Sequence, residues 1–357
     1  MSELCLVVIA RDEARCIGRC LESAAPFVDR MLVLDTGSKD DTAVIASAHG
    51  ATVHSFPWTG HFAQARNRSL SLANADWNLV LDADEWIAPG MSREVLRRHM
   101  DSSKAGGLLR IRSEIDVGDR VEAAETWIPR LLPRGVQYRG RIHEQPMTMG
   151  PDRHLEFVVL HDGYRSAMSF SKNQRNLPLI EQFLAEDPTN PYLHYQMGVQ
   201  CEVTQDWKAA CHHYENARRC GAAGLPFENA MDSRNLYALG QAGRMEDALT
   251  LGLQARERWP TSADIHFAFG DLCLSVAAKD PARALDTWLP AAEASWLRCL
   301  EIGEVADSDS RVLGRGSHLA AHNLAVIYEY CGQKERALAY RQMAAKPCSA
   351  QPVHEQT

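Results

Sequence analysis

The chain has 357 residues, of which 45% are hydrophobic and 24% are charged. This length allows two or three domains with cores of their own, and the composition excludes a disordered or fibrous protein. The 46 acidic residues outnumber the 38 basic ones, which argues against a protein whose main task is to bind nucleic acid phosphates.

The first half of the chain alternates short apolar runs with amphipathic segments. Buried strands are predicted over 4–10, 31–35 and 77–82, a further strand over 51–56, and helices over 13–25, 41–49 and 61–74. This order implies right-handed crossovers and a mostly parallel sheet. Because ligands bind at the carboxyl ends of the strands in such open sheets, we expect the loops that carry Arg11, Asp35 and Asp82 to meet at one edge.

Shorter and less regular runs follow from Gly106 onward. They cover 107–113, 126–133, 136–146 and 155–164. We predict strands and loops that complete the sheet and cover its cleft. The predicted α/β domain therefore spans residues 1–170.

After residue 170 strand signals almost vanish, and a 3.6-residue periodicity replaces them. Small residues recur there at spacings typical of tetratricopeptide repeats. The matches are Gly198, Ala210, Tyr214 and Ala217; then Ala248, Ala255 and Pro260; then, with an insertion, Gly270, Ala284, Trp288 and Ala291; and finally Tyr328, Ala337 and Ala344. We predict stacked helix pairs over 171–347 and a flexible tail over 348–357. A helical bundle without repeats is the alternative.

The cellular location is predicted from apolar runs and cysteines. No run approaches the ~18 apolar residues of a membrane span. Glu3 stands where a signal peptide would carry a positive charge. The ten cysteines form no CxxC pair, which favours reduced thiols over a zinc or redox site. We therefore expect a cytoplasmic protein.

The motif LVLDADE at 79–85 carries the clearest chemistry. Asp82 and Asp84 lie two residues apart at the end of a buried strand, and in an extended chain they would project to the same side. Two carboxylates suit Mg²⁺ or Mn²⁺, which commonly share ligands with a substrate diphosphate. A solvated loop is the competing interpretation.

Four blocks, in order, resemble the nucleotide-binding half of a family 2 glycosyltransferase with the GT-A fold. They read LVVIARDEA, VLDTGSKDDT, FAQARNRSL and DWNLVLDADEW. The later blocks RIHEQP at 141–146 and LHDGY at 160–164 resemble a subgroup that joins this domain to C-terminal tetratricopeptide repeats. Sublancin-type peptide S-glycosyltransferases belong to that subgroup, and lipopolysaccharide-core glucosyltransferases have a related N-terminal half. The resemblance covers roughly residues 4–220.

The resemblance implies a nucleotide-sugar site. Asp35 would hold the nucleobase, usually uracil, whose imide N–H a carboxylate can accept. The base and ribose pocket would be lined by Ala10, Arg11 and Glu13, where this chain departs from the common family pattern. Arg66 and Asn67 would face the same cleft, and Arg66 could clamp ribose, diphosphate or Asp84. A surface arginine and a cap are the alternative for these two residues.

The resemblance also implies a third ligand for the cation. Many GT-A enzymes supply a late histidine, and His161 follows an apolar run in LHDGY. Neutral imidazole is compatible with Mn²⁺. A core histidine bonded to backbone is the competing explanation.

The implied chemistry is inverting sugar transfer. We predict Glu144, beside His143, as the general base that removes the acceptor proton. Asp116 and Asp162 are weaker candidates. Glu144 could instead be structural and pair with one of the arginines between Arg130 and Arg141.

The leading hypothesis is a metal-dependent inverting transferase that uses a nucleotide-sugar, most simply a UDP-sugar, and a peptide or protein acceptor held by the repeats. A lipopolysaccharide or other glycan acceptor is the second hypothesis within the enzyme class. The third is an inactive transferase fold that serves as an interaction scaffold. The repeats could also mediate self-association as a homodimer.

Overall fold

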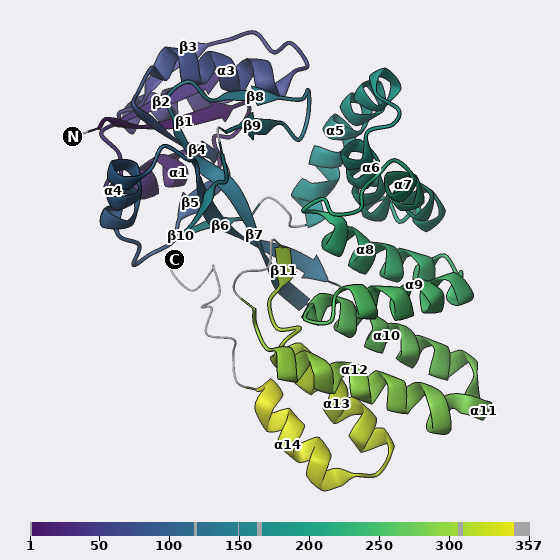
Figure 1. Ribbon diagram of the computed structural model, residues 1–357. Helices are drawn as coiled ribbons and strands as arrows, with labels where there is room; N and C mark the ends of the chain where they lie inside the picture. Colours follow the sequence, from purple (N-terminus) through teal and green to yellow (C-terminus); the bar gives the residue numbers. More distant parts are fainter. Residues whose placement is uncertain (1, 118–119, 149, 163–165, 306–309, 346–357) are drawn as a thin grey trace. The chain divides into compact units, whose positions relative to one another are not determined.

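The N-terminal part of the chain is built on a β-sheet whose first half is parallel (Figure 1). The computed structural model describes residues 2–117, 120–148, 150–162, 166–305 and 310–345. The parallel strands are β1 (Leu4–Ala10), β2 (Arg30–Asp35), β3 (Thr52–Ser55) and β4 (Trp77–Asp82). They pair in the order β3-β2-β1-β4. The predicted strands are confirmed, and their ends differ by at most one residue.

Helices cover both faces of this half-sheet. They are α1 (Ile17–Ala24), α2 (Thr42–Ala48), α3 (Phe62–Ala73) and α4 (Arg93–Ser102). Successive side chains of a strand point to opposite faces. On β1, Leu4, Leu6 and Val8 therefore pack in one core with α1, α2 and α4, and Cys5 and Val7 pack in another with α3. Burial on both faces explains why β1 is a continuous apolar run.

Helix α1 is shorter than predicted. The segment before it forms a turn in which the carbonyl of Glu13 accepts the N–H groups of Cys16 and Ile17. The helix therefore begins at Ile17. Helix α3 ends within one residue of its predicted end. Asn74 follows the last residue of α3 and adopts φ 42°, a left-handed conformation that stops the helix.

The second half of the sheet is mixed. It contains β5 (Glu85–Ile87), β6 (Gly107–Val117), β7 (Arg120–Pro133) and β10 (Arg153–His161), while β8 (Gln137–Arg139) and β9 (Gln145–Met147) form a separate pair. β7 runs antiparallel to both β4 and β6, β10 runs parallel to β6, and β5 closes this side antiparallel to β10. The sequence did not predict β5 or α4.

The described C-terminal part is helical apart from the short strand β11 (Ser310–Val312). Its helices are α5 (Ser166–Glu186), α6 (Pro191–Val203), α7 (Trp207–Arg219), α8 (Glu228–Gln241), α9 (Met245–Arg258), α10 (Ala263–Lys279), α11 (Pro281–Arg283), α12 (Leu289–Ile302), α13 (His318–Tyr330) and α14 (Lys334–Ala344), with a π-helical segment at Ala284–Trp288. Consecutive pairs such as α6 with α7 and α13 with α14 pack together. The chain divides into two compact units, and the boundary between them falls between residues 179 and 180. The predicted tail at 348–357 lies outside the described residues.

Small residues bring the paired helices close, as predicted for the first repeat unit. A Cβ added at Gly198 would lie 2.4 Å from the ring of Tyr214, so only glycine allows this approach. In the third unit the sequence alignment is wrong. Gly270 packs against Trp296, which follows it by 26 residues, whereas Tyr214 follows Gly198 by 16.

Of the ten extra residues of the third unit, four lengthen α10 after Gly270 and six lengthen the connection to α12, which contains α11 and the π-helical segment. They shift the repeat positions, and the buried residues are Ala292, Trp296 and Cys299 rather than the predicted Ala284, Trp288 and Ala291. Residues 278–288 are exposed or half-buried, so no buried face marks the extent of the insertion in the sequence pattern.

A methyl group at Gly198 is expected to destabilise the helical unit. Because the Tyr214 ring is fully buried, the clash must be relieved by overpacking, which costs about 1–3 kcal/mol. Gly198→Ala should lower the free energy of unfolding by that amount in urea titrations. The matched control is Gly240→Ala within α8, where the added Cβ meets only Leu272 at 3.7 Å and the helix should gain about 0.5–1 kcal/mol. Equal stability of the two variants would contradict the packing.

His266 in α10 is expected to make the helical unit sensitive to acid. Burial, followed by the charge of Arg256, lowers the pKa of His266 to about 4. The unfolded chain keeps a histidine pKa near ~6.5 and so takes up the proton first, which removes stability as the pH falls from about 6.5 to 4. His266→Gln does not titrate and should lose less stability between pH 7 and pH 5, as measured by urea midpoints. An unchanged pH dependence would be evidence against this assignment.

None of the helices in the described ranges is long and apolar enough to cross a membrane. The described cysteines are free thiols.

Candidate active site

The loops after β1 and β2 interlock at the carboxyl edge of the sheet. The strand register places Asp35 beside Ala10, whose carbonyl accepts the backbone N–H of Thr36 at 2.9 Å. The Asp35 carboxylate accepts the backbone N–H of Ser38 at 3.2 Å, and the Ser38 hydroxyl accepts the N–H of Asp12 at 3.0 Å. Asp12 has φ 56°, and its carboxylate accepts a backbone N–H of the β2 loop at 2.7 Å. Sequence reasoning missed Asp12, because its left-handed backbone leaves no pattern.

Arg11 and Glu13 flank this loop differently. Arg11 is exposed and makes an ion pair of 3.8 Å with Asp12. Glu13 donates its backbone N–H to the hydroxyl of Thr42 at 2.8 Å, and its carboxylate accepts the thiol of Cys16 at 3.2 Å. The structure therefore leaves the Arg11 guanidinium near solvent and fixes Glu13 at the start of α1.

The DADE segment is a tight turn, and the expected extended chain is not found. β4 ends at Asp82 and β5 begins at Glu85, with a turn between them. The Glu85 carboxylate accepts the N–H of Asp82 at 3.0 Å, which closes the turn. Asp82 and Asp84 consequently have different surroundings, because side chains alternate only along an extended chain.

Five charged side chains form an alternating chain of ion pairs around Asp82. Arg66 on α3 pairs with Asp82 and, at 3.1 Å, with Glu144. Arg130 on β7 pairs with the other oxygen of Asp82 at 2.8 Å and with Glu85. Both guanidiniums are buried. Of these residues, Glu85 was not predicted, and Arg130 was named as a possible partner of Glu144.

This network keeps Asp82 ionised. Burial alone would raise the pKa of the Asp82 carboxyl, but the charges of Arg130 and Arg66 outweigh it and hold the pKa well below its usual range. For Glu85, burial dominates and raises the pKa. Arg66 is buried, so the alternative of a surface arginine is wrong. Its guanidinium pairs with Asp82 and Glu144 rather than with Asp84.

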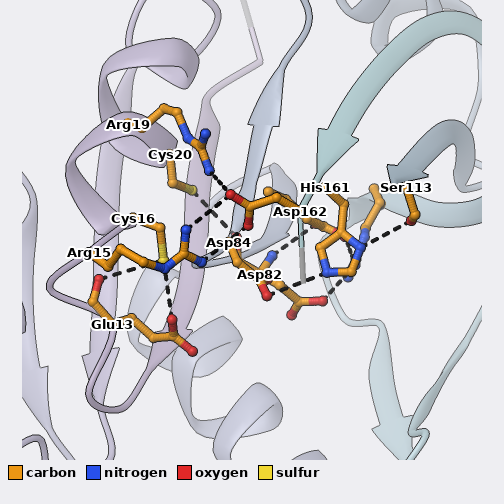
Figure 2. A network of polar contacts seen from close by, with 12 residues as sticks. Glu13, Arg15, Cys16, Arg19, Cys20, Asp82, Asp84, Ser113, His161 and Asp162 are labelled. Atoms are coloured by element: carbon orange, nitrogen blue, oxygen red, sulfur yellow. Dashed lines mark hydrogen bonds and ion pairs between the residues drawn. The ribbon is translucent and has the colours of Figure 1, made fainter. Parts of the chain in front are cut away.

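Asp84 and His161 lie together in a second cluster. The Asp84 carboxylate lies 3.4 Å from Nε2 of His161, and the side chains are 7% and 9% exposed. The competing interpretation of a solvated loop is wrong for Asp84, because the turn directs its side chain inward, where it is buried. Nδ1 of His161 lies 3.0 Å from the hydroxyl of Ser113. Figure 2 shows the imidazole between these two side chains.

The residue after His161 anchors the end of β10 to α1 and to the turn before it (Figure 2). The Asp162 carboxylate accepts hydrogen bonds from both terminal nitrogens of Arg15, at 3.0 and 3.1 Å. It accepts a third hydrogen bond from a terminal nitrogen of Arg19, at 2.6 Å. Burial opposes ionisation, but the hydrogen bonds from Arg15 and Arg19 lower the pKa of Asp162. Arg19 also stacks on Trp86 at 3.5 Å. A carboxylate held in this way is a poor candidate for a general base. The side chain of Asp116, the other weaker candidate, lies outside the described residues.

The loop with Glu144 is held by α3. Both ends of the Asn67 amide bond to the backbone of Tyr138 in β8, at 3.0 and 2.7 Å, so this amide positions β8. His143 has φ 50°, and burial lowers its pKa to about 4, which keeps the imidazole neutral at physiological pH. The arginine that pairs with Glu144 is Arg66, outside the segment 130–141 in which the sequence placed a partner.

The donor set at Asp84 and His161 fits a small divalent cation in part. Ligands on an octahedral ion at about 2.1 Å are roughly 3 Å apart, close to the observed 3.4 Å between Asp84 and His161. Among the described residues, no group of three or more histidine, cysteine or acidic side chains is arranged to hold a metal. The predicted set of Asp82, Asp84 and His161 is thus not assembled, because two arginines bind Asp82. The remaining ligand positions would belong to water and a diphosphate.

Comparisons with known proteins agree with the predicted N-terminal glycosyltransferase domain. Residues 5–161 match the family described as Glycosyl transferase family 2. A TPR repeat-containing protein of Synechococcus elongatus is 31% identical over 227 residues, which cover 59% of this chain and 55% of that protein. The SPbeta prophage-derived glycosyltransferase SunS of Bacillus subtilis is 26% identical over 199 residues, covering 52% and 46%. This chain spans about half the length of the curated relatives that it matches. Its N-terminal part is a family 2 glycosyltransferase domain, as predicted.

Two solved structures are similar over a smaller part. Glucosyl-3-phosphoglycerate synthase from Mycobacterium tuberculosis, solved with Mn²⁺ and UDP-glucose, is 24% identical with a TM-score of 0.27 and covers 31% of this chain and 44% of its own. Mannosyl-3-phosphoglycerate synthase from Rubrobacter xylanophilus is 24% identical with a TM-score of 0.28, covering 33% and 42%.

Proposed function

We propose that this chain is an inverting glycosyltransferase that takes its sugar from a nucleotide-sugar, most simply a UDP-sugar, with Mn²⁺ or Mg²⁺. The observation that carries the proposal is the buried pair of Asp84 and His161 beside the ion-paired Asp82, at the edge of a family 2 glycosyltransferase domain. Asp84 and His161 would hold the cation. A bound cation would neutralise the charge of the leaving diphosphate.

Other residues at this edge would bind the nucleoside and the acceptor. Asp35, with Ala10, Arg11 and Glu13, would line the pocket for base and ribose. Asp82 is ionised and 40% exposed, so it can accept hydrogen bonds from ribose hydroxyls.

Glu144 would accept the proton of the acceptor as its nucleophile attacks the anomeric carbon and the nucleoside diphosphate leaves. Its side chain is 11% exposed and bonded to Arg66 through one oxygen. The neutral imidazole of His143 lies next to it in the chain. Arg66 links Glu144 to Asp82, so it would orient both carboxylates.

The acceptor is proposed to be a peptide or protein. This rests on the resemblance of the blocks at 141–146 and 160–164 to sublancin-type peptide S-glycosyltransferases and on helix pairs of the kind that form extended binding surfaces. A glycan acceptor remains the second candidate. A cytoplasmic location and a homodimer stay predictions.

Calorimetry with nucleotides tests the donor site. We expect UDP to bind the full chain more tightly with Mn²⁺ than with EDTA, and GDP and dTDP to bind more weakly. A hydrolysis screen across UDP-, GDP- and dTDP-sugars then identifies the sugar. If no nucleotide binds in a metal-dependent way, the inactive scaffold is the better interpretation.

Substitutions on the repeats test whether the helical unit binds the acceptor while the N-terminal unit binds the donor. Tyr237 and Tyr330 lie on the first helices of two pairs and are 54% and 81% exposed. The double variant Tyr237→Ser, Tyr330→Ser should keep donor hydrolysis and lose transfer to acceptor, at least about tenfold if two exposed aromatic contacts of ~1 kcal/mol each are lost. Equal loss of hydrolysis and transfer would show that the repeats complete the active site.

A further inference from the structure

The imidazole of His161 has a defined partner on the side opposite Asp84. Ser113 on β6 and His161 on β10 are direct neighbours in the register of these two parallel strands. The Ser113 hydroxyl lies 3.0 Å from Nδ1 of His161, and Ser113 is 7% exposed. The contact is therefore buried and set by strand pairing rather than by a loop (Figure 2).

The two ring nitrogens of a neutral histidine have different functions. One carries the proton and the other carries the lone pair, and the hydrogen bond at one nitrogen decides the state of the other. A histidine that binds a cation through Nε2 needs its proton on Nδ1, with an acceptor for that proton. A serine hydroxyl can act as this acceptor.

We propose that Ser113 is a positioning residue for the cation site, whose hydroxyl accepts the Nδ1–H of His161 and so presents the lone pair of Nε2 toward Asp84. This inference rests on the proposed function, because it gives Asp84 and His161 the task of holding a divalent cation. No sequence motif singled out Ser113, which lies in a strand 48 residues before His161.

The main chain of His161 is held in place by its neighbours, so the imidazole can move only by rotation of the side chain. The bond to Ser113 restricts this rotation. His161 pairs with Glu85 of β5 as well as with Ser113 of β6. The next residue, Asp162, is bound by Arg15 and Arg19. With the main chain held in this way, the hydroxyl bond sets which edge of the imidazole faces Asp84.

The test is a titration of the full-length chain with Mn²⁺ in the presence of saturating UDP, with free Mn²⁺ measured by electron paramagnetic resonance. Ser113→Ala should raise the dissociation constant for Mn²⁺ about 10–100-fold, as the loss of an outer partner of a metal ligand does. Ser113→Thr keeps the hydroxyl and should bind as the unsubstituted chain does. The matched control is Ser295→Ala, which deletes another fully buried hydroxyl that bonds only to a helix carbonyl among the contacts of the described residues.

The outcomes separate this inference from the proposed function. If the unsubstituted chain binds Mn²⁺ with UDP and Ser113→Ala binds it equally well, the positioning assignment is overturned while the cation site stands. If the unsubstituted chain binds no Mn²⁺ with UDP, the proposed function fails and this inference fails with it. Should the alanine variant not fold, Ser113→Cys, whose sulfur is a weak acceptor, must show the same weakening.

Discussion

Replacing Asp84 with asparagine is expected to abolish metal-dependent nucleotide binding and to lower kcat/KM for sugar transfer at least about 10²-fold, which corresponds to ~2.7 kcal/mol. The amide keeps the shape of the carboxylate but lacks the negative charge with which Asp84 would attract the cation, and neutral His161 cannot replace that charge. Asparagine is a better probe than alanine here, because the side chain is 7% exposed and lies 3.4 Å from His161. Calorimetry of UDP binding with Mn²⁺ and with EDTA measures the effect.

A surface carboxylate provides the control for this substitution. Asp101 lies near the end of α4 and is exposed, so Asp101→Asn should bind and transfer as the unsubstituted chain does. Unchanged transfer by the Asp84 variant would mean that the cation, if one is used, is held elsewhere.

Glu144→Gln is expected to keep donor binding and to lose transfer. A glutamine carbonyl can still accept the Nε–H of Arg66, which now bonds to Glu144 at 3.1 Å, so the loop should keep its position. The amide cannot take up the acceptor proton, and the loss of a general base typically costs about 10²–10⁴-fold in rate. Initial rates of transfer, with UDP affinity measured alongside, separate these two effects.

The control for Glu144 must also lose an ion pair. Glu125 on β7 is 3% exposed in its side chain and pairs with Arg112 at 2.8 Å, so Glu125→Gln removes a buried charge of the same type. It should lower stability and leave the rate of the folded enzyme unchanged. If Glu144→Gln instead weakens donor binding and transfers at the normal rate, Glu144 is a positioning residue. Asp116 would then be the next base to test, since two arginines already bind Asp162.

The sequence alone determined the parallel half of the sheet and which residues follow its strands at the carboxyl edge. The run that forms β1 is apolar throughout, and the run that forms β4 has only Asn78 and its last residue, Asp82, as polar residues. Such runs are typical of strands that are buried on both faces. A polar residue directly after such a run must emerge at the carboxyl edge, which is why Asp35 and Asp82 could be placed. The helical character of the second unit is equally local, because it follows from 3.6-residue periodicity.

Only the tertiary structure decided which charges pair and which side chains are buried. Arg66 lies on a helix, Arg130 on β7 and Glu144 in a loop, and their convergence on one network depends on the antiparallel pairing of β7 with β4. The pattern of DADE likewise does not distinguish an extended chain from the turn that buries Asp84, since both begin after the same strand. Partners far apart in sequence are brought together by strand register and helix packing, and these depend on the whole core rather than on any local run of residues.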